Sequence, residues 1–167
     1  MAQIAYYHQW PIASNGSVDY VTSSLSIHIS SELNTTFDWA NMTPTYGENS
    51  SESSCTAVAE LMREIGYAME MDYTDNGSGA NQIQIACGIV DHLGYDKGLR
   101  IRYADTYVTE DWVEMLKEEL NSGRPVLYCG YTQMNEGHAF VCDGYNEEGL
   151  FHINWGWGGM SDGYFVI

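Results

Sequence analysis

Four short β-like segments follow one another at the end of the chain, and they constrain the fold more than any other feature. The segments are PVLYCGY, GHAFVCDGY, LFHINW and DGYFVI, and they lie within residues 125–167. Runs of β-branched and aromatic residues that are separated by short turn-rich stretches are typical of neighbouring strands. We therefore expect an antiparallel sheet in this part of the chain.

An amphipathic helical pattern stands out in the first half of the chain. The helix is predicted to begin with Ser53 or Ser54 as its cap and to end at Gly66. Its expected apolar face consists of Ala57, Val58, Leu61, Met62 and Ile65. This spacing predicts a helix that packs one side against a core.

Two further helices are predicted before the sheet. One carries Ile85, Ile89 and Leu93 on one side, with Gly94 beyond its end. The other, TEDWVEMLKEELNSG, has acidic residues in its first turn and Gly123 after its end. Both features suit the helix dipole and the left-handed residue that often follows a helix.

The segments between these helices are predicted with less regular structure. Residues 13–54 are rich in Ser, Thr and Asn, so we expect loops with a short helix or two near residues 18–33. Residues 71–82 are expected to form a turn-rich loop. The run RIRYADTYV, residues 100–108, is predicted to be a strand.

Helices that precede an antiparallel sheet indicate an α+β architecture. A chain of 167 residues is long enough for one domain with a real core and short for two. We expect a single domain over residues 1–167, with a mainly helical and loop lobe at 1–99 and a mainly β lobe at 100–167.

The charge of the chain excludes some classes of partner. Six basic residues against twenty-three acidic ones give a net charge of −17, which is unsuited to nucleic acid or an anionic membrane surface. No stretch has the length of a transmembrane helix or the pattern of a signal peptide. Because the chain also lacks CxxC, HExxH and a complete calcium-loop pattern, we expect no metal or other cofactor.

A histidine on one predicted strand and an Asn-Trp pair on the next indicate nucleophilic catalysis. In GHAFVCDGY, Gly137 precedes His138 and lets a substrate or another backbone approach closely. In FHINWGWGG, Asn154 is followed by Trp155 and a glycine-rich run that suits a loop at the edge of a site. Cysteine proteases of the papain type combine a thiolate, a histidine and an orienting asparagine in this manner.

These motifs resemble the streptopain family of bacterial cysteine peptidases. The resemblance rests on GHAFVCDGY, on FHINWGWGGMSDGYF, on MAQIAYYHQWP at the start, and on MEMDY with the Gly/Ser loop after it. It extends over nearly the whole chain, and the motifs occur in the order found in the family. The resemblance implies a papain-like α+β fold and a secreted, extracellular enzyme made as a zymogen with an N-terminal pro-segment.

The same resemblance implies roles for particular residues. His138 corresponds to the catalytic histidine, Asn154 to its orienting partner and Trp155 to the residue that shields them. Three further positions would lie beside the substrate cleft: Gly137, Tyr131 and Ser78 in the Gly/Ser loop. The implied partners are protein or peptide substrates and the pro-segment or a dedicated inhibitor. The resemblance implies no cofactor. The segment Asn135-Glu136 departs from a family segment that is richer in glycine.

The nucleophile is where the chain departs most from the family. In the family a cysteine begins the central helix in a stretch like CVATAxAQIM, and residues 2–4 match its end. We therefore expect the nucleophile to precede Met1, and the chain as given to lack thiol-dependent peptidase activity. The family also continues past DGYF through a Gly-rich loop, so a truncation at both ends is expected.

Two other interpretations remain open. The chain could be a non-catalytic relative that uses its cleft as a binding or inhibitory module. Alternatively, Cys55 in SSCTAVAELM could serve a cell-wall peptide amidase of the NlpC/P60 kind, because the first turn of a helix favours a thiolate. We expect Cys55 instead to be a free, partly buried thiol and Cys87 and Cys129 to belong to the core. Cys142 shares a strand with the histidine, so its geometry is unsuited to attack.

Overall fold

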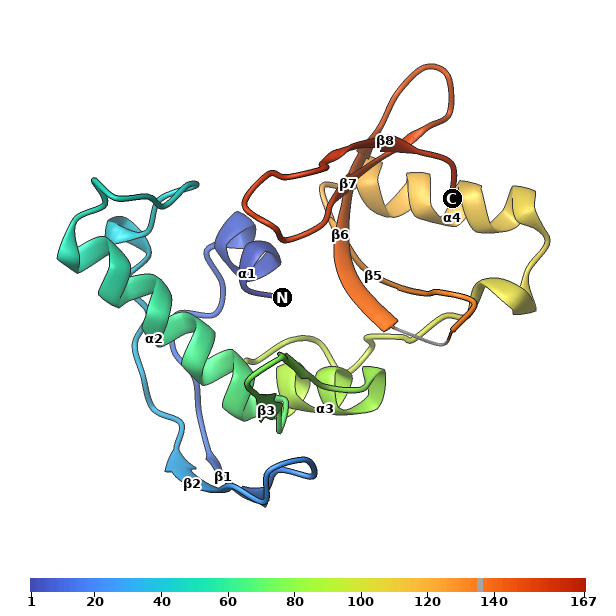
Figure 1. Cartoon of the computed structure of the whole chain (residues 1–167). Helices are drawn as coiled ribbons and strands as arrows, with labels where there is room; N and C mark the ends of the chain where they lie inside the picture. Colours follow the sequence, from blue (N-terminus) through green and yellow to red (C-terminus); the bar gives the residue numbers. More distant parts are fainter. Residues whose placement is uncertain (135–136) are drawn as a thin grey trace. The chain divides into compact units, whose positions relative to one another are not determined.

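The computed structural model describes residues 1–134 and 137–167, and these form two compact units. The units are Met1–Ile101 and Arg102–Ile167, and each is described by itself (Figure 1). Asn135 and Glu136, where the sequence departs from the family, lie outside the described residues. Whether the two units act as the single domain predicted over residues 1–167 stays a prediction.

The unit Met1–Ile101 contains three α-helices and two β-hairpins among the described elements. In chain order they are α1 (Ala2–His8), β1 (Ser17–Val21), β2 (His28–Glu32), the 3₁₀ helix η1 (Trp39–Asn41), α2 (Glu52–Ala68), β3 (Asp72–Thr74), β4 (Gly77–Gly79) and α3 (Gln82–His92). Helix α1 begins without a side-chain cap, and the residue after it, Gln9, is left-handed. None of the described helices is both long and apolar enough to cross a membrane.

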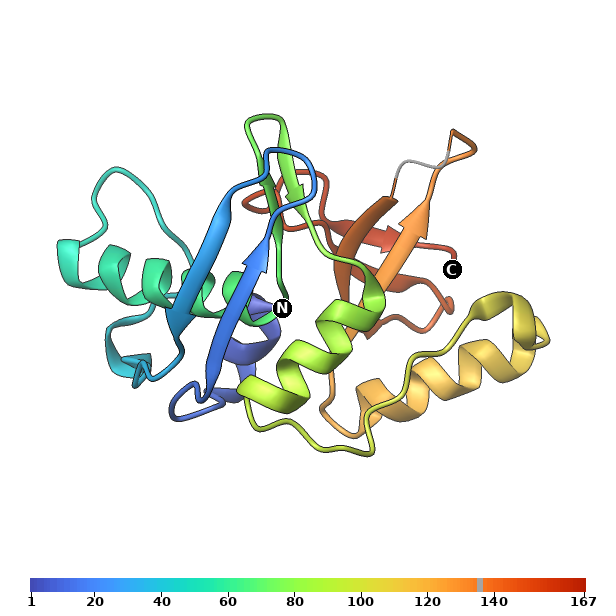
Figure 2. The same ribbon diagram turned by 90° about the horizontal axis from the view of Figure 1, so that it is seen from below.

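The first hairpin corrects the expectation of a short helix near residues 18–33. Strand β1 pairs antiparallel with β2, and Figure 2 shows the two side by side in blue. Val18 is buried and Tyr20 half-buried, whereas their neighbours Ser17, Asp19 and Val21 are exposed. Burial that alternates at every second residue indicates a strand with one buried face. The abundance of Ser and Thr in this segment favoured loops in the prediction instead.

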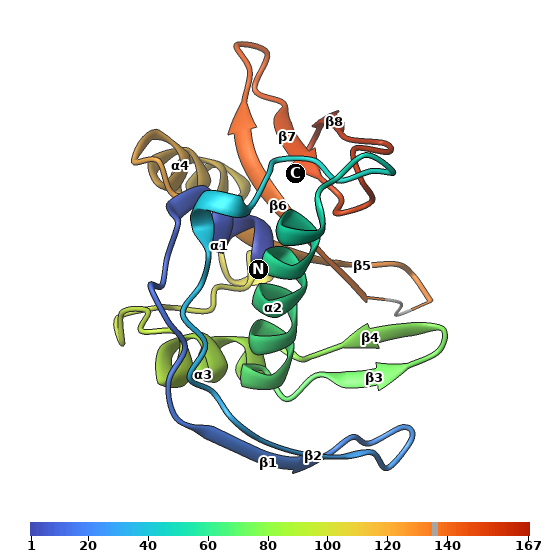
Figure 3. The ribbon, with the colours of Figure 1, turned by 90° about the vertical axis from the view of Figure 1, so that its left-hand side faces the viewer.

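A second hairpin occupies the segment that was expected to be a turn-rich loop. Strands β3 and β4 pair antiparallel around the turn Asp75-Asn76, as Figure 3 shows. The carboxylate of Asp72 on β3 accepts hydrogen bonds from the hydroxyl groups of Ser23 and Ser24, at 2.8 and 2.6 Å. These bonds attach the loop after β1 to the second hairpin and lower the pKa of Asp72.

Helix α2 begins earlier and ends later than predicted. Its cap is Ser51, whose hydroxyl accepts a hydrogen bond from the N–H of Ser54 at 3.2 Å. The helix continues through Gly66 to Ala68, so the prediction that Gly66 ends it is wrong. A Cβ at Gly66 would collide with the hydroxyl oxygen of Tyr73 on β3, so this glycine lets α2 pack closely against that side chain.

The core of this unit lies between the helices and the first hairpin. Ala57, Leu61 and Ile65 are buried as predicted, whereas Met62 is 60% exposed. The prediction for α3 is confirmed, because Ile89 and Leu93 are buried; Asn81 caps the helix. The buried residues of this core are Ala5, Val18, Leu33, Phe37, Met42, Ala57, Leu61, Ile65, Ala68, Met69, Ile89 and Leu93.

The unit Arg102–Ile167 is a four-stranded sheet covered by one helix. Its elements are the 3₁₀ helix η2 (Ala104–Thr106), α4 (Thr109–Asn121), β5 (Val126–Tyr131), β6 (Gly137–Tyr145), β7 (Phe151–Asn154) and β8 (Gly163–Phe165). The strands are antiparallel in the order β5-β6-β7-β8, so the predicted sheet and the helix before it are confirmed. The core side chains from α4 and the sheet are Trp112, Leu116, Phe140, Cys142, Phe151 and Ile153.

The strand predicted over residues 100–108 is wrong. This segment contains only η2 and irregular backbone within the described part of the chain. Only Ile101 and Tyr107 are half-buried in this segment, and Tyr103 and Val108 are 55% and 61% exposed, so the segment has no buried face. A strand needs a partner that satisfies its backbone and covers one side, and no described strand pairs with it.

The four cysteines are free, and their exposure differs partly from expectation. Cys55 and Cys87 are exposed, so the predictions of a partly buried and a core thiol are wrong. Cys129 is half-buried, and Cys142 is fully buried. Burial raises the pKa of Cys129 and raises that of Cys142 to about 11, which keeps both as neutral thiols at neutral pH.

Candidate active site

His138 lies at the second residue of β6, next to the end of β5. It is half-buried and pairs in register with Gly130, while Gly137 pairs with Tyr131. A Cβ at Gly137 would lie 2.8 Å from Cε1 of the Tyr131 ring. Gly137 therefore leaves room for the Tyr131 ring, a side chain, where the approach of a substrate or another backbone was predicted.

Aromatic rings surround the imidazole of His138 within the same unit. The ring centroid of Trp157 lies 5.0 Å from that of His138, and the centroids of Trp155 and Phe140 lie at 6.1 and 6.4 Å. Trp155 and Trp157 stack on each other at 5.7 Å with an interplanar angle of 18°. Packing of this kind restricts rotation of the imidazole and keeps water from part of its surface.

One nitrogen of His138 is bonded to the backbone. Nε2 lies 2.9 Å from the carbonyl oxygen of Trp155. A carbonyl oxygen can only accept, so Nε2 carries the proton and donates it. In the neutral ring Nδ1 is then the unprotonated nitrogen.

Asn154, at the end of β7, is linked to His138 through a single peptide group. Its Oδ1 accepts a hydrogen bond from the N–H of Gly156 at 3.0 Å. This N–H belongs to the same peptide unit as the Trp155 carbonyl that holds His138. Fixing one end of a peptide unit fixes the direction of the other, because the unit is planar.

Asp162 holds the backbone N–H of Trp155, a role that no sequence motif predicted. Its Oδ1 accepts a hydrogen bond from the N–H of Trp155 at 2.9 Å. Trp157, whose ring faces His138, was also quoted in the motif without a role. The only sequence signal for Asp162 is an acidic residue beside the glycine that begins the next strand, and this signal is weak.

The predicted substrate-binding residues Tyr131 and Ser78 lie in different units. Tyr131 ends β5 and is 61% exposed, and its ring contacts the position of Gly137. The structure therefore brings together Tyr131, Gly137, His138 and Trp155. Ser78 belongs to the other unit, where it is exposed on β4 and pairs with Tyr73.

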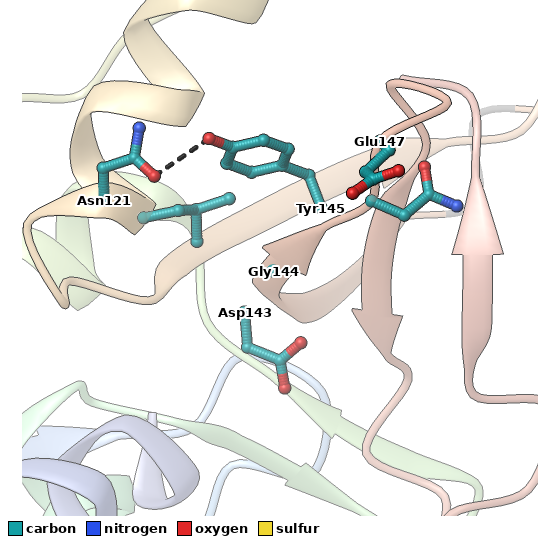
Figure 4. A pocket seen from close by; sticks show the side chains of 7 residues that line it. Asn121, Asp143, Gly144, Tyr145 and Glu147 are labelled. Atoms are coloured by element: carbon teal, nitrogen blue, oxygen red, sulfur yellow. Dashed lines mark hydrogen bonds between the residues drawn. The ribbon is translucent and has the colours of Figure 1, made fainter.

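A second histidine, His152 on β7, pairs with Gly144 toward the other end of β6. Nδ1 of His152 is 2.5 Å from Oδ1 of Asp143, and the Tyr164 ring packs edge-on against the imidazole at 5.2 Å. A pocket of about 420 Å³ lies beside Asp143, between the end of α4 and residues 143–147. Figure 4 shows Tyr145 in this pocket directed toward Asn121, whose Oδ1 accepts its hydroxyl proton at 2.9 Å. Among the described residues no group of His, Cys, Asp and Glu is arranged to hold a metal ion.

Comparison with protein families and known structures supplies the context for this site. Residues 1–165 match the model of the Peptidase C10 family. The chain is 34% identical over 169 residues to the thiol protease/hemagglutinin PrtT of Porphyromonas gingivalis, covering 100% of this chain and 19% of that protein. It is 31% identical over 173 residues to streptopain of Streptococcus pyogenes, covering 99% of this chain and 43% of streptopain. The chain thus spans less than half the length of these curated relatives.

Solved structures agree with the sequence matches. The active wild-type interpain A cysteine protease of Prevotella intermedia superposes with a TM-score of 0.88 at 37% identity, covering 99% of this chain and 71% of that chain. A fragment of prointerpain A from the same organism gives a TM-score of 0.87 at 39% identity, covering 99% and 54%. The predicted resemblance to streptopain and the predicted papain-like α+β fold are both confirmed.

Proposed function

The chain belongs to the Peptidase C10 family, and from that premise we propose that it carries the histidine-bearing part of a cysteine endopeptidase domain. The reaction is hydrolysis of peptide bonds in protein substrates. The observation that carries the proposal is the bond from His138 Nε2 to the Trp155 carbonyl. It leaves Nδ1 as the nitrogen that can take and return a proton.

The proposed chemistry passes through an acyl-enzyme. A cysteine thiolate attacks the scissile carbonyl carbon, and the protonated imidazole of His138 gives its proton to the leaving amine as the C–N bond breaks. His138 then takes a proton from water, and the resulting hydroxide attacks the thioester. Cleavage of the C–S bond releases the carboxylic acid and restores the thiolate.

The neighbours of His138 have supporting roles in this proposal. Asn154 orients the imidazole through the Gly156 N–H and the Trp155 carbonyl, to which it is connected by one peptide unit. The Trp155 ring stacks against the imidazole with centroids 6.1 Å apart, and in this proposal it shields His138 from water. We assign Gly137, Tyr131 and Ser78 to substrate binding, and the exposure of Tyr131 and Ser78 is compatible with it.

The nucleophile, in this proposal, is none of the four cysteines of the chain. Cys142 is fully buried with a pKa of about 11, and burial also raises the pKa of Cys129. Neither thiol supplies a thiolate at neutral pH. Cys55 and Cys87 are exposed on α2 and α3, whereas the resemblance to the family places the nucleophile ahead of residues 2–4. The chain as given is therefore expected to lack thiol-dependent peptidase activity.

A pair of chains tests this proposal. The first is the 167-residue chain, and the second is the same chain extended at its N-terminus by the cysteine-bearing helix start of streptopain. With casein as substrate, we expect cleavage only by the extended chain, and we expect alkylation or His138→Ala to abolish it. A folded extended chain without activity would contradict the proposal and favour a non-catalytic binding or inhibitory module.

The 167-residue chain without the extension tests whether Cys55 is the nucleophile. If it cleaves casein or a cell-wall peptide and Cys55→Ser abolishes the activity, the nucleophile is Cys55 and the proposed assignment is wrong. Cys87→Ser is the matched control, because Cys87 is the other exposed thiol of the same unit.

The context of the enzyme is also part of the proposal. We assign it to secretion as a zymogen whose pro-segment occupies the site until it is removed; a dedicated inhibitor is a further partner of this kind. The match to a fragment of prointerpain A supports a pro-segment. Detection of the mature chain in culture supernatant, shorter than the form in the cells, would test this assignment.

A further inference from the structure

Asp162 closes the loop that carries Trp155. Its carboxylate accepts a hydrogen bond from the backbone N–H of Trp155, the first residue of the loop, at 2.9 Å. Three glycines between them, Gly156, Gly158 and Gly159, have φ of 79, 67 and 87°. A backbone with so many left-handed glycines has many accessible paths, so a bond between its two ends restricts the loop strongly.

The Asp162 side chain binds a backbone group just beyond the last pair of the β7–β8 ladder. The last pair between β7 and β8 is Ile153 with Gly163. Beyond it, the N–H of Trp155 is bonded to the Asp162 carboxylate, and its carbonyl is bonded to His138. Trp155 is thus fixed through both of its backbone polar groups, and one of the two partners is the proposed acid–base residue.

We propose that Asp162 is a positioning residue for His138. By holding the Trp155 N–H, it fixes the peptide unit that precedes the Trp155 carbonyl. Together with the Asn154 bond to the Gly156 N–H, this limits rotation of the carbonyl that keeps the imidazole protonated on Nε2 and open on Nδ1. A carboxylate suits this task because a charged acceptor forms a shorter and stronger hydrogen bond than a neutral one. The role rests on the proposed peptidase function, in which a single tautomer of His138 is required, but its geometry does not depend on a nucleophile.

The test is a nitrogen and proton NMR measurement of His138 in the 167-residue chain, at a pH at which the imidazole is neutral. In the wild-type chain we expect a protected Nε2–H signal and an unprotonated Nδ1. In Asp162→Ala the exchange of the Nε2–H with water should become roughly tenfold faster or more, because a charged hydrogen bond is lost. Asp162→Asn keeps a neutral acceptor oxygen, which forms a weaker hydrogen bond than the carboxylate, so exchange should accelerate but by less than in Asp162→Ala.

Asp143→Ala is the matched control, because Asp143 holds the other histidine of this sheet, His152. It should change the His152 signals and leave those of His138 unaltered, while Asp162→Ala does the reverse. If Asp162→Ala fails to fold, Asp162→Asn decides: the Trp155 amide and the His138 Nε2–H should then accelerate together. Faster exchange at the Trp155 amide with an unchanged His138 would overturn the inference.

The activity assay separates this inference from the proposed function. An extended chain without proteolysis contradicts the peptidase proposal and leaves the NMR result standing. An active extended chain whose His138 signals do not respond to either Asp162 substitution contradicts only the positioning role.

Discussion

Replacing Gly88 by alanine would place a methyl group against the backbone of another helix. Gly88 lies on α3, and a Cβ there would be 2.2 Å from the carbonyl oxygen of Ala68 and 3.0 Å from the nitrogen of Met69. A relaxed carbon–oxygen contact needs about 3.3 Å or more, so α3 would have to move by about 1 Å from the end of α2. Because the obstacle is backbone rather than a flexible side chain, no rotamer change relieves it.

Two effects of opposite sign decide the stability of Gly88→Ala. Alanine is favoured over glycine inside a helix by about 1 kcal/mol. Against this gain, overpacking a tight contact costs typically about 1–3 kcal/mol, and displacing α3 loosens the buried Ile89 and Leu93 as well. Loss of a third to a half of their burial would add about 1–3 kcal/mol. The net expectation is a destabilisation of about 1–5 kcal/mol.

Urea denaturation followed by circular dichroism measures this difference as a lower midpoint at an unchanged slope. Gly79→Ala is the control, because nothing lies within 4 Å of a Cβ there and its φ is not positive. It should change the free energy of unfolding by no more than about 0.5 kcal/mol. If Gly88→Ala is as stable as the wild-type chain, or gains the 1 kcal/mol of helix propensity, the close contact between α2 and α3 is refuted.

Three further predictions concern the thiols and one buried carboxylate. In the native chain Cys55 and Cys87 should react with a thiol reagent in seconds to minutes while Cys142 reacts only on unfolding; fast labelling of Cys142 would contradict its burial. The pKa of Cys142 is raised to about 11, so its thiol stabilises the fold below about pH 8.5 and this contribution is lost as the pH rises toward 11. Cys142→Ala should therefore reduce the pH slope of stability in that window by up to about 1.4 kcal/mol per pH unit, and an unchanged slope in urea titrations would refute it. Glu64 is 1% exposed and accepts a hydrogen bond from the hydroxyl of Ser14 at 2.5 Å, so Glu64→Ala should cost about 1–3 kcal/mol in urea unfolding, and a loss below about 0.5 kcal/mol would contradict this role.

Local patterns predicted the second unit of the fold well and parts of the first poorly. The strands β5–β8 were found because alternating apolar residues coincide with turn formers at both ends of each segment. The hairpin β1–β2 has the same period, but its exposed face includes Ser and Asp, which also favour loops. Residues 100–108 have the alternation without a described partner strand, and pairing between strands is decided by the whole fold.

The side chains of the candidate site could be predicted from the sequence, but their backbone partners could not. His138, Asn154 and Trp155 stand out through residue type and motif order, and the structure describes their surroundings. The acceptor on His138 is a backbone carbonyl, which every residue possesses, so the sequence offers no signal for it. The role of Asp162 depends on the path of the loop, and that path is set by glycine conformations that the sequence permits without specifying.

A backbone acceptor changes which substitutions can disturb His138. Replacing the Trp155 side chain removes the ring that packs near the imidazole but leaves the carbonyl in place. Substitutions that alter the loop backbone act on the carbonyl itself. Gly156 is the sharpest case, because its N–H belongs to the same peptide unit and its φ of 79° is left-handed, where an L-residue costs about 1–2 kcal/mol. The orientation of His138 should therefore depend more on Gly156, Asn154 and Asp162 than on the Trp155 ring. Gly156 and Asn154 hold the peptide unit of the carbonyl, and Asp162 holds the unit before it.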